Sequence, residues 1–232
     1  MARPNGVHHF AICTSDMKAQ IAYFTDVLGM ELVALYWMHG AERTWHGFLK
    51  LNDQSSIAFV QNDAIARIPV EIGVTHAGNP GAPCASGTLQ HIAFNVDTHA
   101  ELLAMRDRIR SRGVDVFGHI DHGLCKSIYF AGPEGLCLEV ATSEGQSIDP
   151  RLWIDPEVVE LAGISADELG RFKSPAKFEP PSQPVAQPSL DPSKPHMVFP
   201  EAVYEAIFNA SDDEITARMS EPTPPVRAAV PA

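Results

Sequence analysis

Two histidines and one glutamate have types and spacings that could bind a metal ion together. His9 opens the segment HFAI, and His91 opens the similar segment HIAF 82 residues later. Glu139 lies in the apolar run LCLEVA, where a carboxylate needs a partner because burying an unpaired charge is costly. Two imidazole nitrogens and one carboxylate, with coordination positions left open, suit a divalent metal such as Fe(II). The sequence therefore predicts a metal site at these three residues.

An internal repeat would bring these side chains together. Each histidine opens a strand-like segment, which a helical pattern and three further strand-like segments follow. Ala58 and Glu139, in the last strand of each copy, are 81 residues apart, nearly the offset of the histidines. Asp16 or Ser15 is a plausible N-cap of the first helix, and Thr98 with Glu101 fits a capping box for the second. The repeat predicts an α+β fold of two tandem βαβββ modules that form cupped mixed sheets.

The alternation of side chains along a strand separates the two adjacent histidines at the start of the chain. Successive residues of a strand point to opposite faces, so His8 and His9 should not share a role. His9 is equivalent to His91, whereas His8 is equivalent to Gln90, and glutamine is a poor metal ligand. We therefore expect His9 to face the metal and His8 to face away.

The remaining sequence predicts a linker and a long C-terminal extension. Residues 175–200 hold eight prolines and should be extended, with short helices before and after them. The extension should cover the body or a partner subunit of a homodimer, because it carries apolar side chains that need cover: Phe178, Phe199, Tyr204, Ile207 and Phe208. The expected parts are a first module (6–62), a linker (63–88), a second module (89–145) and a Pro-rich C-terminal extension with short helices (146–232).

Composition disfavours several classes of partner. The net charge is −12 and no Lys/Arg cluster is visible, which disfavours nucleic acid and anionic membrane surfaces. The four cysteines form no CxxC pair, the N-terminus lacks the apolar segment of a signal peptide, and no apolar run approaches about 20 residues. We expect a cytoplasmic protein with reduced thiols.

Two segments resemble a known family. HHFAICTSDMKAQIAYFTDVLGM is similar to the module opening of the vicinal oxygen chelate superfamily, and SIYFAGPEGLCLEV is similar to its module end. That superfamily includes glyoxalases, bleomycin resistance proteins and extradiol dioxygenases. The resemblance covers about residues 6–145 and implies a metal inside the cup, bound by His9, His91 and Glu139. Ala131-Gly132 stands before Pro133, where the family usually has the aspartate of a DPxG turn.

One departure narrows the chemistry that the resemblance implies. Members with four metal ligands take a Glu or Gln from the position of Ala58, which argues against the chemistry of glyoxalase I and methylmalonyl-CoA epimerase. Extradiol dioxygenases, which use three ligands, resemble this chain in having a histidine and a tyrosine upstream of the ligand glutamate. This assigns proton transfer to His122 and Tyr129, with His119 as the alternative histidine. His76, in the linker, could reach over the mouth of the cavity.

The function expected from these residues is an oxidoreductase of the extradiol dioxygenase type. It would cleave a catechol-like aromatic diol with Fe(II) and O2. One alternative is a glyoxalase-like lyase, isomerase or transferase that uses Mn(II), Ni(II) or Zn(II) as a Lewis acid. Another is a non-enzymatic small-molecule binding protein of the bleomycin resistance kind.

Overall fold

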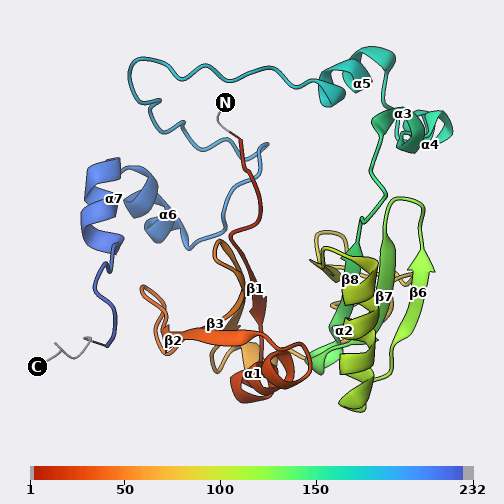
Figure 1. Cartoon of the computed structure of the whole chain (residues 1–232). Helices are drawn as coiled ribbons and strands as arrows, with labels where there is room; N and C mark the ends of the chain where they lie inside the picture. Colours follow the sequence, from red (N-terminus) through yellow and green to blue (C-terminus); the bar gives the residue numbers. More distant parts are fainter. Residues whose placement is uncertain (1–2, 227–232) are drawn as a thin grey trace, which may run out of the picture.

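The computed structural model describes residues 3–226 and contains two four-stranded mixed sheets (Figure 1). The sheet orders are β1-β4-β3-β2 and β5-β8-β7-β6. In each sheet the first and last strands of the module pair in parallel, and the other neighbours are antiparallel. The prediction of tandem βαβββ modules is confirmed.

The two modules have the same order of elements. The first consists of β1 (His9–Cys13), α1 (Met17–Asp26), β2 (Glu31–Trp37), β3 (Trp45–Asn52) and β4 (Ser55–Gln61). The second consists of β5 (Ile92–Asn95), α2 (His99–Ser111), β6 (Phe117–Asp121), β7 (Lys126–Ala131) and β8 (Cys137–Thr142). Short 3-10 helices lie in the linker, η1 (Ile65–Arg67), and before β8, η2 (Pro133–Gly135).

The helices begin at the capping residues that the sequence indicates. Asp16 is the N-cap of α1, and its side chain accepts a hydrogen bond from the Ala19 amide. This satisfies one of the backbone N–H groups of the first turn, which have no acceptor within the helix. Thr98 and Glu101 form the expected capping box at the start of α2. Gly29, with φ +79°, follows α1 in the left-handed conformation that glycine adopts most readily.

Strand register makes Ala58 and Glu139 equivalent. Ala11 of β1 lies opposite Ala58 of β4, as Ala93 of β5 lies opposite Glu139 of β8. On the other side of the same strands, Phe48 pairs with Ala58, and Tyr129 pairs with Glu139. The second module thus carries a carboxylate and a phenol where the first carries a methyl group and a phenyl ring.

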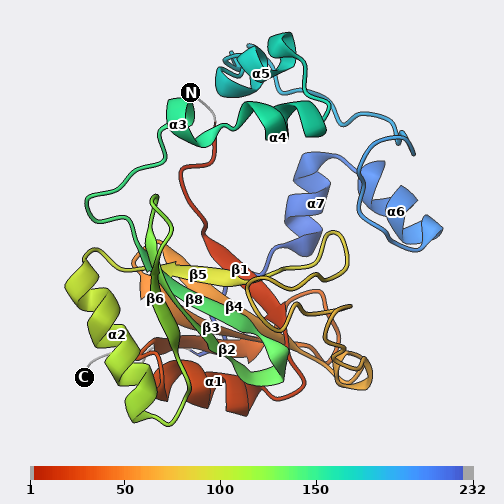
Figure 2. The same cartoon turned by 90° about the vertical axis from the view of Figure 1, so that its right-hand side faces the viewer.

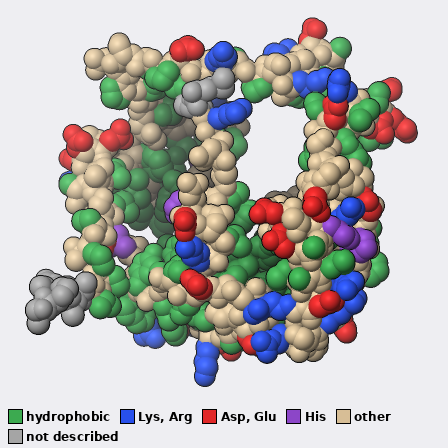
Figure 3. Space-filling model, in the orientation of Figure 1, with side chains coloured by type: hydrophobic (Ala, Val, Ile, Leu, Met, Phe, Trp, Pro, Cys, Tyr) green, Lys and Arg blue, Asp and Glu red, His purple; other side chains and the backbone are tan. Residues whose placement is uncertain are grey.

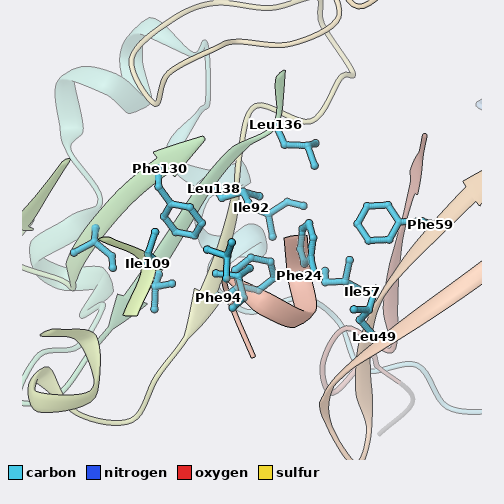
Figure 4. Packing of buried hydrophobic residues seen from close by; sticks show 14 of the residues in the cluster. Phe24, Leu49, Ile57, Phe59, Ile92, Phe94, Ile109, Phe130, Leu136 and Leu138 are labelled. Carbon is cyan, nitrogen blue, oxygen red and sulfur yellow. The ribbon is translucent and has the colours of Figure 1, made fainter. Parts of the chain in front are cut away.

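One hydrophobic core joins the two modules (Figure 4). Phe24 of α1 is fully buried, and its ring centroid lies 5.1 Å from that of Phe59 in its own module and 6.3 Å from that of Phe94 in the other. Arg108 of α2 adds polar contacts, since its guanidinium donates hydrogen bonds to the Val27 carbonyl oxygen at 2.8 Å and to the Asp26 carbonyl oxygen at 2.9 Å. The helices therefore hold the two sheets in a fixed relation.

Glu134 of η2 ties the second module to the start of α1. Its carboxylate accepts hydrogen bonds from the Thr14 hydroxyl at 2.6 Å, the Ser15 amide at 2.8 Å, the Ser15 hydroxyl, and the Gln20 amide at 2.8 Å. Burial raises the pKa of Glu134, but the hydrogen bonds from Ser15, Thr14 and Gln20 outweigh it, so the pKa lies below its ordinary value. The carboxylate form of Glu134 is therefore the form that this contact favours.

The C-terminal extension arches away from the modules (Figure 2). Its helices are α3 (Pro150–Trp153), α4 (Pro156–Leu161), α5 (Ala166–Lys173), α6 (Glu201–Phe208) and α7 (Asp212–Met219), with irregular chain between α5 and α6. Phe178 remains 54% exposed, so the arch does not bury it. Tyr204 stacks on Phe208 with ring centroids 4.2 Å apart, and the chain then returns toward β2. Among the described residues, no helix has the length and apolar character needed to cross a bilayer.

Candidate functional site

The side chains of His91 and Glu139 contact each other at one edge of the second sheet. His91 immediately precedes β5, and Glu139 lies on the neighbouring strand β8 with only 5% of its surface exposed. The distance between His91 Nε2 and Glu139 Oε2 is 3.0 Å. Two of the three predicted metal ligands are therefore adjacent in the structure.

Gln90 fixes which nitrogen of His91 faces the carboxylate. The Gln90 amide nitrogen donates to the carbonyl oxygens of Asn79 and Ala82, both at 3.2 Å. Its oxygen is therefore the atom that contacts His91 Nδ1, which must donate the hydrogen. In the neutral ring the lone pair then resides on Nε2 and points at the Glu139 carboxylate. Two Lewis bases this close need a cation between them, either a proton or a metal ion.

The pair suits two adjacent positions around a divalent metal ion. Donor atoms at right angles around an ion, with bonds of about 2.1 Å, are roughly 3.0 Å apart, as these two atoms are. A hydrogen bond to the other ring nitrogen is the usual outer-shell support of a ligating histidine. The sequence identifies Gln90 only as a poor ligand and does not predict this supporting role. Its position next to a predicted ligand was the available signal.

His9 does not join the pair in this structure. Its ring lies 5.4 Å from that of Phe48 and 6.3 Å from that of His46, measured between centroids. Between residues 3 and 226, no three His, Cys, Asp or Glu side chains lie close enough to hold one metal ion. Ala11, two residues along β1, nevertheless lines a cavity of about 130 Å³ together with His91. The assignment of His9 as a ligand therefore stays a prediction.

His8 lies beside His9 in the structure, and the expectation that it faces away from the metal stays a prediction. β1 begins at His9, so His8 precedes the strand and the alternation rule does not reach it. The Nδ1 atoms of the two rings lie 2.8 Å apart, within hydrogen-bond distance. His8 is thus a neighbour of His9 that could hold its ring in place.

His122 and Tyr129 form a hydrogen-bonded pair beside Glu139. His122 Nε2 lies 3.0 Å from the Tyr129 hydroxyl, and Tyr129 pairs across strands with Glu139. Burial and the charge of Glu139 raise the pKa of Tyr129, so the phenol keeps its proton at neutral pH. The alternative histidine, His119, packs instead on His99 with centroids 4.6 Å apart. The structure thus brings together the two residues predicted for proton transfer.

Two cavities adjoin this group of residues. One of about 450 Å³ is lined by Tyr129, Phe117 and the linker segment 78–81, and its size is in the range of small-molecule pockets. The smaller cavity, next to His91, is lined by His76, the linker histidine expected at a cavity mouth. Cys137 lines both cavities and lies two residues before Glu139 on β8.

His46 has an unusual environment on β3. It is only 7% exposed, and its Nε2 has no hydrogen-bond partner among the described residues. Burial, followed by the nearby His9, lowers the pKa of His46. The sequence pattern gave no signal for this, because the rings around His46 come from three strands, with His9 on β1, Tyr36 on β2 and Phe48 on β3.

Curated relatives match the modules of this chain. Biphenyl-2,3-diol 1,2-dioxygenase 3 of Rhodococcus globerulus is 23% identical over 132 residues, which cover 57% of this chain and 60% of that protein. Biphenyl-2,3-diol 1,2-dioxygenase 2 of the same organism is 26% identical with the same coverage. The chain thus spans 60% of the length of these relatives.

Solved structures also match. A glyoxalase/bleomycin resistance protein/dioxygenase domain from Frankia sp. EAN1pec is 15% identical, with a TM-score of 0.49 over 61% of this chain and 99% of that one. TnmS3, an antibiotic binding protein from Streptomyces sp. CB03234, is 16% identical, with a TM-score of 0.44 over 62% and 99%. The model of the Glyoxalase/Bleomycin resistance protein/Dioxygenase superfamily matches residues 6–140, more than half of the chain. By that match, and with tandem βαβββ modules as its fold, this protein belongs to that superfamily.

Proposed function

We propose that this protein is a metal-dependent dioxygenase of the extradiol type, which cleaves a catechol-like ring next to its two hydroxyl groups. The observation that carries the proposal is the placement of the His91–Glu139 pair beside the hydrogen-bonded His122–Tyr129 pair. A ligand pair alone would serve any divalent metal, whereas an adjacent phenol and imidazole suit a substrate that must lose a proton. Relatives named as biphenyl-2,3-diol dioxygenases support the same reaction class.

The chain's own residues would bind the metal and handle the proton. In this proposal His91 and Glu139 hold the ion with His9, and Gln90 orients His91. A bound Fe(II) ion supplies the open coordination positions and the redox chemistry that the reaction with O2 requires. His122 Nε2 accepts a proton from one hydroxyl group of the diol through the Tyr129 hydroxyl, which both donates and accepts.

The substrate class follows from the cavity beside Tyr129. It holds about 450 Å³, enough for a substituted aromatic ring, and Phe117 and Phe130 contribute to its walls. An aromatic diol in this cavity would place its ring against these side chains and its hydroxyl groups toward Tyr129. We therefore propose a substituted catechol rather than an aliphatic diol.

Anaerobic reconstitution with Fe(II), followed by oxygen-electrode assays, tests the proposed function. The panel is catechol, 3-methylcatechol and 2,3-dihydroxybiphenyl. We expect one O2 consumed per diol and a coloured ring-cleavage product. His9→Ala should lower the Fe(II) content of the reconstituted protein if His9 is the third ligand. Metal binding with no oxygen uptake on any diol would favour a lyase, isomerase or transferase, and no metal binding would favour the non-enzymatic binding protein.

Replacing Tyr129 by phenylalanine should lower turnover about 100-fold, the lower end of what general acid–base catalysis contributes. The change removes the hydroxyl that contacts His122 and keeps the ring that packs near His91. Fe(II) content should be unchanged, because Tyr129 is not a ligand in this proposal. Tyr204→Phe, in the extension, is the matched control. Equal turnover of Tyr129→Phe and the parent protein would remove Tyr129 from the mechanism.

Replacing Gln90 by leucine should weaken metal binding 10- to 100-fold, the usual effect of losing an outer-shell partner. Leucine cannot accept the hydrogen of His91 Nδ1, so the ring loses its preference for presenting Nε2 to the metal. Competitive titration with a fluorescent chelator measures the affinity. Gln54→Leu, at an exposed turn, is the control. Gln90→Glu keeps an acceptor and should retain most of the affinity; equal losses in both Gln90 variants would indicate a change in the linker instead.

We also propose a homodimer. The edge strand β2 leaves apolar side chains exposed, including Leu32, Val33, Leu35 and Trp37. An exposed apolar strand at a sheet edge is a common site of association. Sedimentation equilibrium at several protein concentrations would test this, and a monomer at every concentration would contradict it.

A further inference from the structure

We propose that Asp115 selects the substrate of the candidate site, a catechol whose short side chain ends in an ammonium group. This inference rests on the proposed function, since it names the substrate class of the cavity beside Tyr129. The hydroxyl groups of the catechol would face Tyr129 and the metal ligands. The ammonium group would face the Asp115 carboxylate at the other side of the cavity.

Asp115 lies on the cavity side of the chain because its two neighbours lie on the core side. Val114 and Val116 pack against the hydrophobic core, whereas Asp115 and Phe117 line the cavity of about 450 Å³. This is the alternation expected of an extended segment, here the one that leads into β6. The two valines fix the backbone from which the Asp115 carboxylate extends.

The width of the sheet suits a substrate of this length. β7 alone separates β6 from β8. Neighbouring strands are about 4.8 Å apart, so the β6 side of the cavity lies roughly 10 Å from Glu139 on β8. The register of Phe117 with Tyr129, continued by two residues, sets Asp115 opposite Ala131, which also lines the cavity. An aromatic ring with a two-carbon side chain spans a similar length, so its far end would reach Asp115.

Asp115 is the charged side chain in the wall of this cavity. The described residues that line it include no lysine, arginine or histidine. The arginines that precede Asp115 have other partners, since Arg112 pairs with Asp26 and Arg110 donates a hydrogen bond to the Val116 carbonyl oxygen. Among residues 3–226, no ion pair includes Asp115. Its carboxylate is therefore available to a cationic ligand.

An aromatic surface lies beside this carboxylate. Phe117 is 66% exposed, and its cross-strand neighbour Tyr129 lines the same cavity. The face of an aromatic ring attracts a cation, because the electrons of the ring give that face a negative potential. A carboxylate next to an exposed aromatic ring favours an ammonium group over an alkyl group, and it repels a carboxylate.

The charge of the whole protein acts in the same direction. The net charge is −12, and Figure 3 shows acidic side chains on both the modules and the extension. A negative field raises the local concentration of cations and lowers that of anions. Asp115 is itself exposed, so salt screens its charge and the discrimination should fall as the ionic strength rises.

Anaerobic calorimetric titration of the full-length protein, incubated with Fe(II) and desalted, tests the proposal without turnover. The three probes are catechols that carry an aminoethyl, a propyl or a carboxyethyl group at position 4, so they differ mainly in charge. At low salt we expect the amine to bind about two- to fivefold more tightly than the propyl compound, and the acid about two- to fivefold more weakly, the range of an exposed ion pair. At about 1 M salt the three affinities should converge.

Two variants at Asp115 separate its charge from its shape. Asp115→Asn should bring the three affinities to within about twofold of one another, and Asp115→Lys should reverse their order. Asp167→Asn, at an exposed residue of α5, removes the same charge from the protein and should keep the order of the parent protein. Thermal melts establish that each variant folds.

Oxygen consumption by the same three diols separates this inference from the proposed function. If the diols bind in the expected order and none is oxidised, the dioxygenase proposal fails and the role of Asp115 stands. The role of Asp115 is overturned if the amine does not bind, or if Asp115→Asn and Asp115→Lys keep the order of the parent protein, whether or not oxygen is consumed.

Discussion

Glu139→Gln is expected to lower Fe(II) affinity by more than about 100-fold and to reduce oxygen consumption to background. The loss should exceed that of an outer-shell variant, which is at most about 100-fold, because Glu139 is proposed to bind the metal directly. Glutamine has nearly the same shape but no charge, and a neutral amide is a weaker ligand than a carboxylate for a divalent cation. The buried position of Glu139 strengthens the effect, because only 5% of its surface is exposed and solvent screens its charge little.

Metal content after reconstitution and oxygen uptake with 3-methylcatechol measure this effect. Glu144→Gln, five residues further along the chain and on the exposed surface, is the matched control and should behave like the parent protein. The thermal midpoint of the metal-free Glu139→Gln variant should be near that of the parent protein, so a loss of metal would not reflect unfolding. Normal Fe(II) content in Glu139→Gln would show that the metal, if any, binds elsewhere.

Glu134→Gln is expected to lower the free energy of unfolding by about 2–4 kcal/mol at pH 7. Hydrogen bonds to a charged group contribute about 1.5–3 kcal/mol each, and their losses at one residue overlap. The glutamine amide can still accept hydrogen bonds at its oxygen. Its nitrogen, however, would face two hydrogen-bond donors that are bonded to the second carboxylate oxygen in the parent protein. Those donors are the Thr14 hydroxyl and the Gln20 amide, or the Ser15 groups, depending on the rotamer.

The same contact predicts a dependence on pH. Because the pKa of Glu134 is lower in the folded protein than its ordinary value of 4.5, its contribution to stability is fully present above that value. The contribution is lost as the pH falls through the lower, folded-state pKa. Urea unfolding at pH 7 and at pH 3 should therefore show a smaller difference between the parent protein and Glu134→Gln at the acid pH. A difference that stays constant would mean that shape, not charge, stabilises the contact. Glu42→Gln is the control, because Glu42 is exposed. Glu101→Gln is unsuitable, because it would break the capping box of α2.

The sequence was sufficient to predict the fold because the relevant signals are local or repeated. The apolar spacing around Phe24, the N-cap at Asp16 and the capping box at Thr98 depend on neighbours within a few residues. The similar spacing of His9 from His91 and of Ala58 from Glu139 then related the two modules. Strand register confirms that Ala58 and Glu139 are equivalent. The assignment of proton transfer to His122 and Tyr129 came from the resemblance to a family, and the structure places the two side chains within hydrogen-bond distance of each other.

Other features depend on contacts that no local pattern encodes. Glu134 accepts a hydrogen bond from Thr14, which is 120 positions away in the chain. The sequence around Glu134 predicts only a turn. The orientation of the Gln90 side chain depends on its hydrogen bonds to two carbonyl oxygens of the linker. A sequence pattern does not show how the irregular linker brings these oxygens to Gln90. His46 appears in the sequence as one polar residue in a strand, and its burial depends on rings that neighbouring strands bring to it. The close approach of the His8 and His9 rings is likewise not predicted by strand alternation, because His8 precedes β1.

The shared core has a consequence for how the modules came to differ. Since Phe24 of one module packs on Phe94 of the other, neither copy of the repeat has a complete interior of its own. Substitutions on the sides of the two sheets that face this core are therefore constrained jointly. The opposite sides are also buried at Ala58 and Glu139, yet the two copies differ there, so only the second copy supplies a carboxylate to the candidate site.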